Sequence, residues 1–107
     1  MKGEGKMFYA KYVINGKEKS ELYFDKAKFI SDTFNPMTEI ITLIDFTVHG
    51  KTYQERKAST ESIAIDWSND GDASGLFMSD LWVLSDWFYR NGKRYGLLED
   101  FTENGLC

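Results

Sequence analysis

The stretch "DWSNDGDASG" has the residue types and the spacing of a calcium-binding loop. The residues at positions 1, 3, 5 and 6 of that pattern are Asp66, Ser68, Asp70 and Gly71, and Asp72 adds a further carboxylate. Calcium binds six to eight oxygen atoms, and a glutamate at position 12 normally closes its loop. Phe77 stands at that position, and Asp, Asn, Ser and Gly are also the ordinary residues of a solvated turn. We therefore expect a turn with no metal and no cofactor, and keep a calcium-binding module as an alternative.

The same part of the chain combines carboxylates with tryptophans. No basic residue occurs from Ala58 to Tyr89, whereas that window contains six acidic residues and all three tryptophans. Residues 1–58 carry ten Lys/Arg and eight Asp/Glu, and residues 59–107 carry three and nine, so the balances are +2 and −6. An acidic field repels phosphates and attracts basic partners. We expect a protein partner with a basic surface, and no direct contact with nucleic acid.

A helix over residues 79–92 would direct some of these side chains outward. Its apolar stripe is formed by Phe77, Leu81, Leu84 and Phe88. At about 100° per residue, Trp82 points away from that stripe, beside Asp86 and Tyr89. An aromatic anchor among charges is typical of a binding hot spot, but a last helix folded over Trp82 would place it in the core instead. The predicted partner-binding residues are Trp82, Asp86 and Tyr89, supported by Asp70, Asp72 and Asp80.

Groups for catalysis are few, and we do not expect an enzyme. His49, the only histidine, falls in a predicted hairpin turn, and Cys107 is the last residue, with nothing to hold a base beside it. No phosphate-binding or dinucleotide-binding glycine motif is present. The single cysteine suits a reducing compartment, and no apolar run is long enough for a signal peptide or a membrane span. The expected location is the cytoplasm.

The predicted architecture is a single α+β domain over residues 1–107, with residues 1–6 as a flexible leader. Asn15–Gly16 predicts a type I′ hairpin turn, and Asp25 predicts the start of a helix that Asn35–Pro36 ends. The expected strands are 7–14, 19–24, 38–48, 51–58 and 61–67, and the expected helices are 26–34, 79–92 and 96–103. Apolar residues on both faces of 38–48 favour a central position in the sheet. This order, β-β-α-β-β-β-α-α, predicts a mainly antiparallel sheet of about five strands with two to three helices.

In type, the whole chain resembles the small accessory proteins of phages and mobile elements, including anti-CRISPR proteins. The shared properties are a short, acidic, aromatic-rich α+β chain without catalytic machinery. Because the resemblance is one of type, it assigns no residue roles. It implies an inhibitor of a bacterial nucleic-acid-targeting defence complex, such as a CRISPR effector, that occupies a basic surface of the complex. A homo-oligomeric accessory protein that buries Trp82 in a homodimer is a further alternative.

Overall fold

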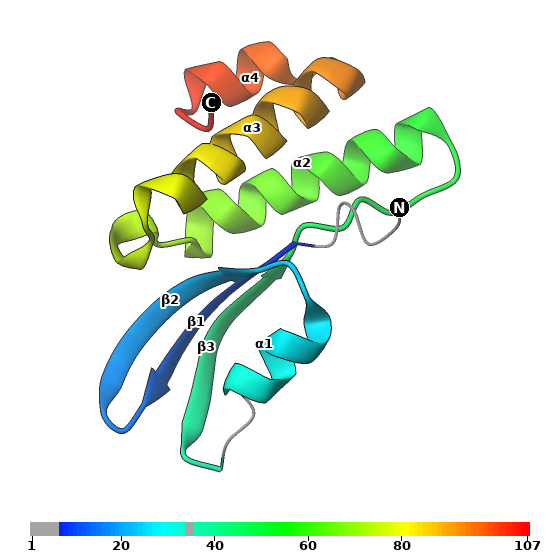
Figure 1. The fold of residues 1–107 in the computed structure, drawn as a ribbon. Coiled ribbons are helices and arrows are strands. Elements are labelled where there is room, and N and C mark those ends of the chain that lie inside the picture. Colours follow the sequence, from blue (N-terminus) through cyan, green and yellow to red (C-terminus); the bar gives the residue numbers. More distant parts are fainter. Residues whose placement is uncertain (1–6, 34–35) are drawn as a thin grey trace. The chain divides into compact units, whose positions relative to one another are not determined.

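The computed structural model describes residues 7–33 and 36–107, so the predicted leader 1–6 and the predicted helix stop at Asn35 lie outside the described residues. The fold is α+β, as expected, but the prediction of about five strands was wrong. Among the described residues there are three strands in one antiparallel sheet, together with four α-helices and a short 3-10 helix (Figure 1). The elements are β1 (Phe8–Ile14), β2 (Lys17–Tyr23), α1 (Lys26–Thr33), β3 (Thr38–Asp45), α2 (Tyr53–Asp70), η1 (Ala73–Gly75), α3 (Met78–Tyr95) and α4 (Leu98–Glu103).

The chain divides into two compact units, each with its own packing. The first contains the sheet, α1 and η1, over residues up to Thr47 and again from Asp70 to Leu76. The second contains α3, α4 and all but the last residue of α2, over Val48–Asn69 and Phe77–Cys107. We call these the sheet unit and the helical unit. The sheet unit is therefore built from two separate pieces of sequence.

The hairpin of the sheet unit confirms the sequence prediction. Asn15 and Gly16 have φ angles of 53° and 77°, the positive values that a type I′ turn requires. Alternate residues of β1 face opposite sides of the sheet, and on one side Ala10 and Tyr12 form a buried cluster with Tyr23. Phe29 of α1 packs on that cluster, with its ring 5.0 Å from the ring of Tyr23. The predicted cap is also present, because the Ala27 N–H donates to Asp25 Oδ1 over 2.9 Å.

β3 is an edge strand and not the central strand that its apolar residues had predicted. The strand order is β2-β1-β3, with β1 in the centre. The pairing shifts by one residue between Lys11 and Tyr12, because these residues face Thr42 and Ile40 and leave Ile41 as the extra residue of a bulge. Apolar side chains on both faces of β3 therefore do not mean burial on both faces: Ile41 and Leu43 are exposed.

One helix, α2, replaces the two strands predicted over residues 51–58 and 61–67. Thr52 and Glu55 form a capping box, in which the Glu55 N–H donates to Thr52 Oγ1 and the Thr52 N–H donates to Glu55 Oε1. These bonds satisfy free N–H groups at the start of the helix. They also lower the pKa of Glu55, chiefly through the backbone bonds from Lys51 and Thr52. Thr60, Ile63 and Ala64 then form its buried face at helical spacing.

α3 and α4 confirm two predicted helices, with different ends. α3 continues past Gly92, the predicted stop, to Gly96, which has a positive φ of 72°. Gly92 is buried inside the helix instead, where a Cβ atom would lie 2.8 Å from Phe101 Cδ2 and 3.2 Å from Leu98 Cα. The missing side chain thus lets α4 approach α3 closely. The buried residues of α3 are Leu84, Trp87, Phe88, Gly92 and Tyr95, whereas Phe77, predicted in the buried stripe, is exposed ahead of the helix.

Candidate protein-binding surface

The outer face of α3 carries the aromatic residues that the helical spacing predicted to point outward. Trp82 is 71% exposed and Tyr89 is 47% exposed, so α4 does not cover Trp82. These two side chains line a shallow hollow of about 320 Å³ together with Ser85, Asp86 and Cys107. We call these five residues the α3 surface. A large exposed tryptophan beside a tyrosine and a carboxylate is the composition of a binding hot spot.

The two carboxylates of α3 that were predicted to bind a partner already interact with groups of the same helix. Asp86 Oδ2 lies 2.8 Å from Arg90 Nε, one helical turn away, and both side chains are well exposed. Such a pair contributes little to stability in water, but it partly neutralises Asp86. Asp80 lies in the first turn of α3, where its negative charge favours the N-terminal end of the helix dipole. The α3 surface is therefore mainly aromatic, with a compensated charge.

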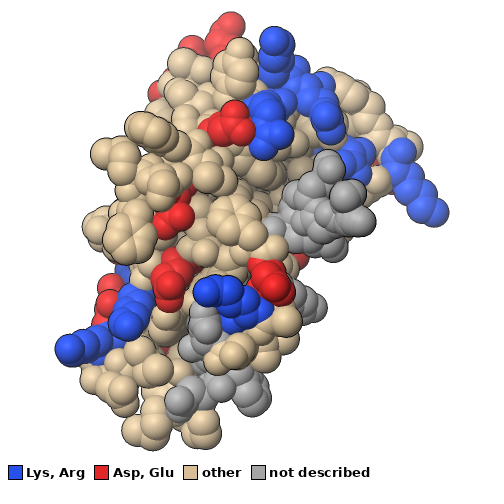
Figure 2. All heavy atoms as spheres, in the orientation of Figure 1, with Lys and Arg blue, Asp and Glu red and all other residues tan. Residues whose placement is uncertain are grey.

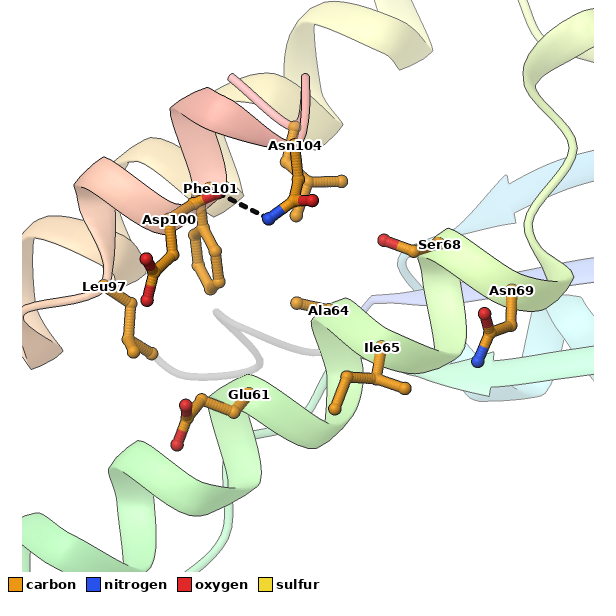
Figure 3. Close-up of a pocket in the computed structure, with 10 residues that line it drawn as sticks. Glu61, Ala64, Ile65, Ser68, Asn69, Leu97, Asp100, Phe101 and Asn104 are labelled. Carbon is orange, nitrogen blue, oxygen red and sulfur yellow. Dashed lines mark hydrogen bonds between the residues drawn. The ribbon is translucent and has the colours of Figure 1, made fainter.

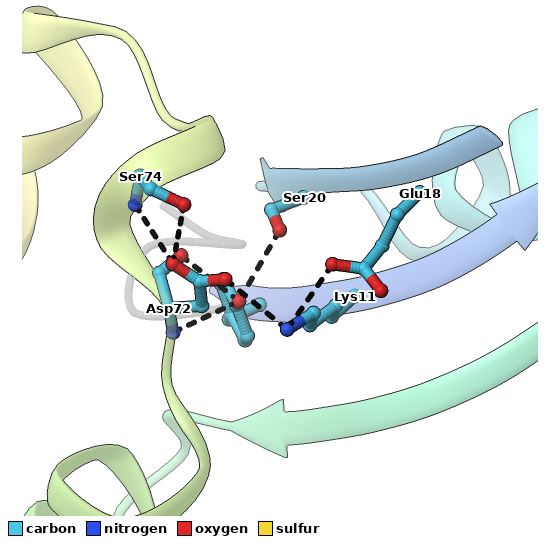
Figure 4. Close-up of polar contacts among 6 residues, drawn as sticks. Lys11, Glu18, Ser20, Asp72 and Ser74 are labelled. Atoms are coloured by element: carbon cyan, nitrogen blue, oxygen red, sulfur yellow. Dashed lines mark hydrogen bonds and ion pairs between the residues drawn. The ribbon is translucent and has the colours of Figure 1, made fainter.

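The remaining predicted site residues, Asp70 and Asp72, belong to the sheet unit, whereas the α3 surface belongs to the helical unit. Asp72 caps η1: its Oδ1 accepts hydrogen bonds from the Ser74 N–H over 3.0 Å and from the Ser74 hydroxyl over 2.6 Å. Its Oδ2 lies 3.1 Å from Lys11 Nζ, which also lies 3.3 Å from Glu18 Oε1 (Figure 4). Asp72 is thus occupied by contacts within its own unit.

Backbone atoms of Asp72 bind the sheet through a buried tyrosine. The Tyr9 hydroxyl lies 3.0 Å from the Asp72 carbonyl oxygen, to which it donates, and 3.0 Å from the Asp72 nitrogen, from which it accepts. Ser20 Oγ lies 3.4 Å from the same hydroxyl, and Gly75 packs against the Ser20 side chain. We call Tyr9, Lys11, Ser20, Asp72 and Ser74, which these contacts join, the Asp72 network. Figure 4 shows the network joining β1, β2 and the start of η1. It attaches the segment Asp70–Leu76 to the face of the sheet opposite α1.

The pKa values in this network follow from its hydrogen bonds. The Ser74 hydroxyl and N–H, followed by the Lys11 ammonium, lower the pKa of Asp72 to about 2. The same partners act in reverse on Lys11, whose pKa is raised first by Asp72 and then by Glu18. On the other face of the sheet, burial raises the pKa of Tyr23, whose hydroxyl donates to Glu21. None of these shifts creates an acid or base that titrates near neutral pH.

The stretch that was expected to form a turn, and that the calcium alternative required as a loop, is helical in its first part. α2 extends to Asp70, so Asp66 and Ser68 lie on helical turns and do not curve around a loop as position 1 and position 3 would. Across residues 7–33 and 36–107, no group of three His, Cys, Asp or Glu side chains is placed to hold a metal ion. The geometry on which the calcium alternative depended is therefore not present.

Charge is mixed on the face of the molecule that Figure 2 draws. Both acidic and basic side chains of the described residues occur there. The C-terminal part of α3 contributes Arg90, Lys93 and Arg94, which restore positive charge close in sequence to the acidic window. None of the described helices has the length and apolarity needed to cross a membrane.

A second hollow in the helical unit was missed by sequence reasoning. It has a volume of about 330 Å³ and lies between α2 and α4 (Figure 3). The residues that line it are Glu61, Ala64, Ile65, Ser68 and Asn69 of α2, with Leu97, Asp100, Phe101, Asn104 and Leu106. Glu61, Ala64, Ile65 and Ser68 have the spacing of one helix face. This spacing can be read from the sequence, but it predicts a shared face only if residues 61–68 are first recognised as a helix.

Comparison with known proteins adds no relative from which a role could be transferred. No protein-family model, curated protein or solved structure matches the chain.

Proposed function

We propose that this chain is a small, non-catalytic protein-binding module whose α3 surface contacts a partner protein. The observation that carries the proposal is the 71% exposure of Trp82 beside Tyr89, around the same hollow. An indole side chain exposed to this extent loses contact with water when a partner covers it, and such aromatic anchors dominate binding energies. The paired Asp86 and Arg90 next to it would supply polar contacts around the anchor.

The partner that we propose is a basic surface of a bacterial nucleic-acid-targeting defence complex, which the chain would inhibit by occupying it. Support comes from the chain's formal net charge of −4 and from the charge balance of its second half, and from its resemblance in type to anti-CRISPR proteins. Because Asp72 is bound within the sheet unit and Asp86 is paired with Arg90, the aromatic anchor contributes more to the proposal than the carboxylates do.

The experiment is a competition assay with purified RNA-guided effector complexes and labelled target DNA. The chain should release DNA from at least one complex, and Trp82→Ala should weaken that inhibition about 30-fold, which corresponds to about 2 kcal/mol. Phe24→Ala is the matched control, because Phe24 is also exposed but belongs to the sheet unit. DNA binding by every complex unchanged at micromolar protein would reject the inhibitor function.

The exposed Trp82 also fits the alternative of a homodimer. An experiment can distinguish binding to a different protein from pairing with a second copy of the chain. Sedimentation velocity at two protein concentrations would show a dimer that Trp82→Ala dissociates if the α3 surface pairs with a second copy. A monomer at both concentrations would leave the surface for a different protein.

A further inference from the structure

We propose that the hollow between α2 and α4 binds an arginine or lysine side chain of a partner protein, together with an apolar residue adjacent to it. This α2–α4 groove is defined by the ten residues given above and shares none of them with the α3 surface. The proposal therefore does not depend on the proposed function and has a separate test.

The floor of the groove is apolar and built from packed residues. Ala64, Leu97 and Phe101 are all buried, and the ring of Phe101 packs edge-on against Phe88 with centroids 5.6 Å apart. The close approach at Gly92 places α4 against α3 and so fixes Phe101. The floor is thus held in place before any ligand arrives, which reduces the entropy cost of binding.

One wall leaves an apolar side chain in water. Ile65 is 58% exposed at the side of the groove, although its neighbour Ala64 is buried. An apolar residue or the methylene chain of a lysine or arginine, placed against Ile65 and the floor, would cover this surface.

The rim supplies negative charge from two elements. Glu61 of α2 and Asp100 of α4 lie on opposite sides of the groove at the same end, with Leu97 between them and Phe101 beside Asp100 (Figure 3). The lining contains no Lys, Arg or His. Within the described part of the chain no ion pair involves Glu61 or Asp100, so both carboxylates are free to accept from a ligand.

These features together favour a cationic and partly aliphatic occupant. A cation is attracted by both carboxylates, whereas an anion is repelled and a purely apolar group leaves the charges unused. A guanidinium group suits this geometry because it donates several hydrogen bonds in one plane to carboxylate oxygens. The volume lies near the lower end of the roughly 300–1,000 Å³ typical of ligand pockets, which suits one or two side chains.

The test uses nuclear magnetic resonance of the full, isotope-labelled chain with an acetylated and amidated Leu-Arg-Leu peptide. The peptide should cause saturable chemical-shift changes at Ala64, Ile65 and Phe101 in the millimolar range. The same peptide with neutral citrulline in place of arginine should bind about fivefold more weakly, as expected for the loss of a partly exposed charge pair.

Matched variants separate the groove from general attraction to an acidic helix. Glu61→Gln and Asp100→Asn should each weaken binding of the arginine peptide several-fold, whereas Glu99→Gln and Glu103→Gln, on α4 but outside the lining, should leave it unchanged. Equal effects of all four substitutions would overturn the site, as would shifts spread over all acidic residues or no shifts at all. Groove shifts that depend on protein concentration without peptide would assign the groove to a second copy and would also overturn the proposal.

Discussion

Asp72 of the Asp72 network and Trp82, Asp86 and Tyr89 of the α3 surface come from the same stretch of sequence without basic residues, but their side chains are used in opposite ways. In the network, the carboxylate and backbone of Asp72 bind Ser74, Lys11 and Tyr9 and attach a segment to the sheet. On α3, the side chains of Trp82 and Tyr89 remain exposed to water. The number of acidic residues in a window therefore does not measure the charge available to a partner, because neighbours brought by the fold can occupy them.

The largest predicted effect is a difference in the free energy of unfolding between substitutions on the buried and the exposed face of α3. Phe88 is 1% exposed and packs against Trp87 and Phe101, so Phe88→Ala should lower the free energy of unfolding by about 3–5 kcal/mol. Trp82→Ala should change it by less than about 0.5 kcal/mol, because the indole is exposed. Urea denaturation followed by circular dichroism measures both. Equal destabilisation by the two variants would mean that Trp82 has a structural role and would break the comparison.

The next effect compares two tyrosines. Tyr9 is fully buried, and its hydroxyl binds both backbone groups of Asp72. Tyr9→Phe should lower the free energy of unfolding by about 1–2 kcal/mol, because it leaves the partly buried N–H and carbonyl groups of Asp72 without the tyrosine hydroxyl. Tyr89→Phe on the α3 surface should be nearly neutral. Urea denaturation of both variants, with hydrogen exchange of residues 72–76, would test whether the loss of stability begins in that segment; an unchanged Tyr9→Phe protein would contradict it.

A smaller effect should appear in how the free energy of unfolding depends on pH in acid. The pKa of Asp72 is about 2 in the folded chain, against 3.8 ordinarily, so its contribution to stability is present above about pH 4 and is lost as the pH falls toward 2. Asp72→Asn, which does not titrate, should show a shallower loss of stability between these values. Ser74→Ala should act in the same direction because it removes the largest cause of the shift. A variant with the acid profile of the original chain would show that Asp72 is not coupled to folding.

The smallest effect concerns the pair beside the aromatic anchor. Asp86→Asn should lower the free energy of unfolding by only about 0.3–0.5 kcal/mol, because its pair with Arg90 is exposed. In the competition assay it should also weaken inhibition less than Trp82→Ala does. If Asp86→Asn proved the more damaging of the two, charge and not the aromatic anchor would dominate the α3 surface.

Local signals explain which parts of the fold were predictable. The Asn15–Gly16 turn and the apolar face of α3 each depend on residues within a few positions. The turn was predicted correctly, and the buried face was predicted correctly at Leu84 and Phe88 but not at Phe77. In α2, two periods coexist: Ile63, Ile65 and Trp67 alternate as in a strand, whereas Thr60, Ile63 and Ala64 follow a helix. The capping box of Thr52 and Glu55 favours the helix, and that signal was overlooked.

The candidate sites divide in the same way. The outward direction of Trp82 follows from helical spacing alone, so it was predictable. The occupation of Asp72 by Lys11 and Tyr9 was not, because those partners lie 61 and 63 residues away in the sequence. The α2–α4 groove also needs two elements distant in sequence, one of which had been assigned to the wrong type of structure.

The division of the sheet unit into two pieces of sequence has a consequence for how the chain can be cut or recombined. A gene fragment that ends after Thr47 would encode all three strands but not the segment Asp70–Leu76, and so would leave the Tyr9 hydroxyl and the Lys11 ammonium without Asp72. The complementary fragment would carry that segment with no sheet to receive it. Although the chain has two compact units, the sheet unit cannot be exchanged or expressed as one uninterrupted module with its contacts complete, whereas a fragment from Val48 to Cys107 contains every residue of the helical unit.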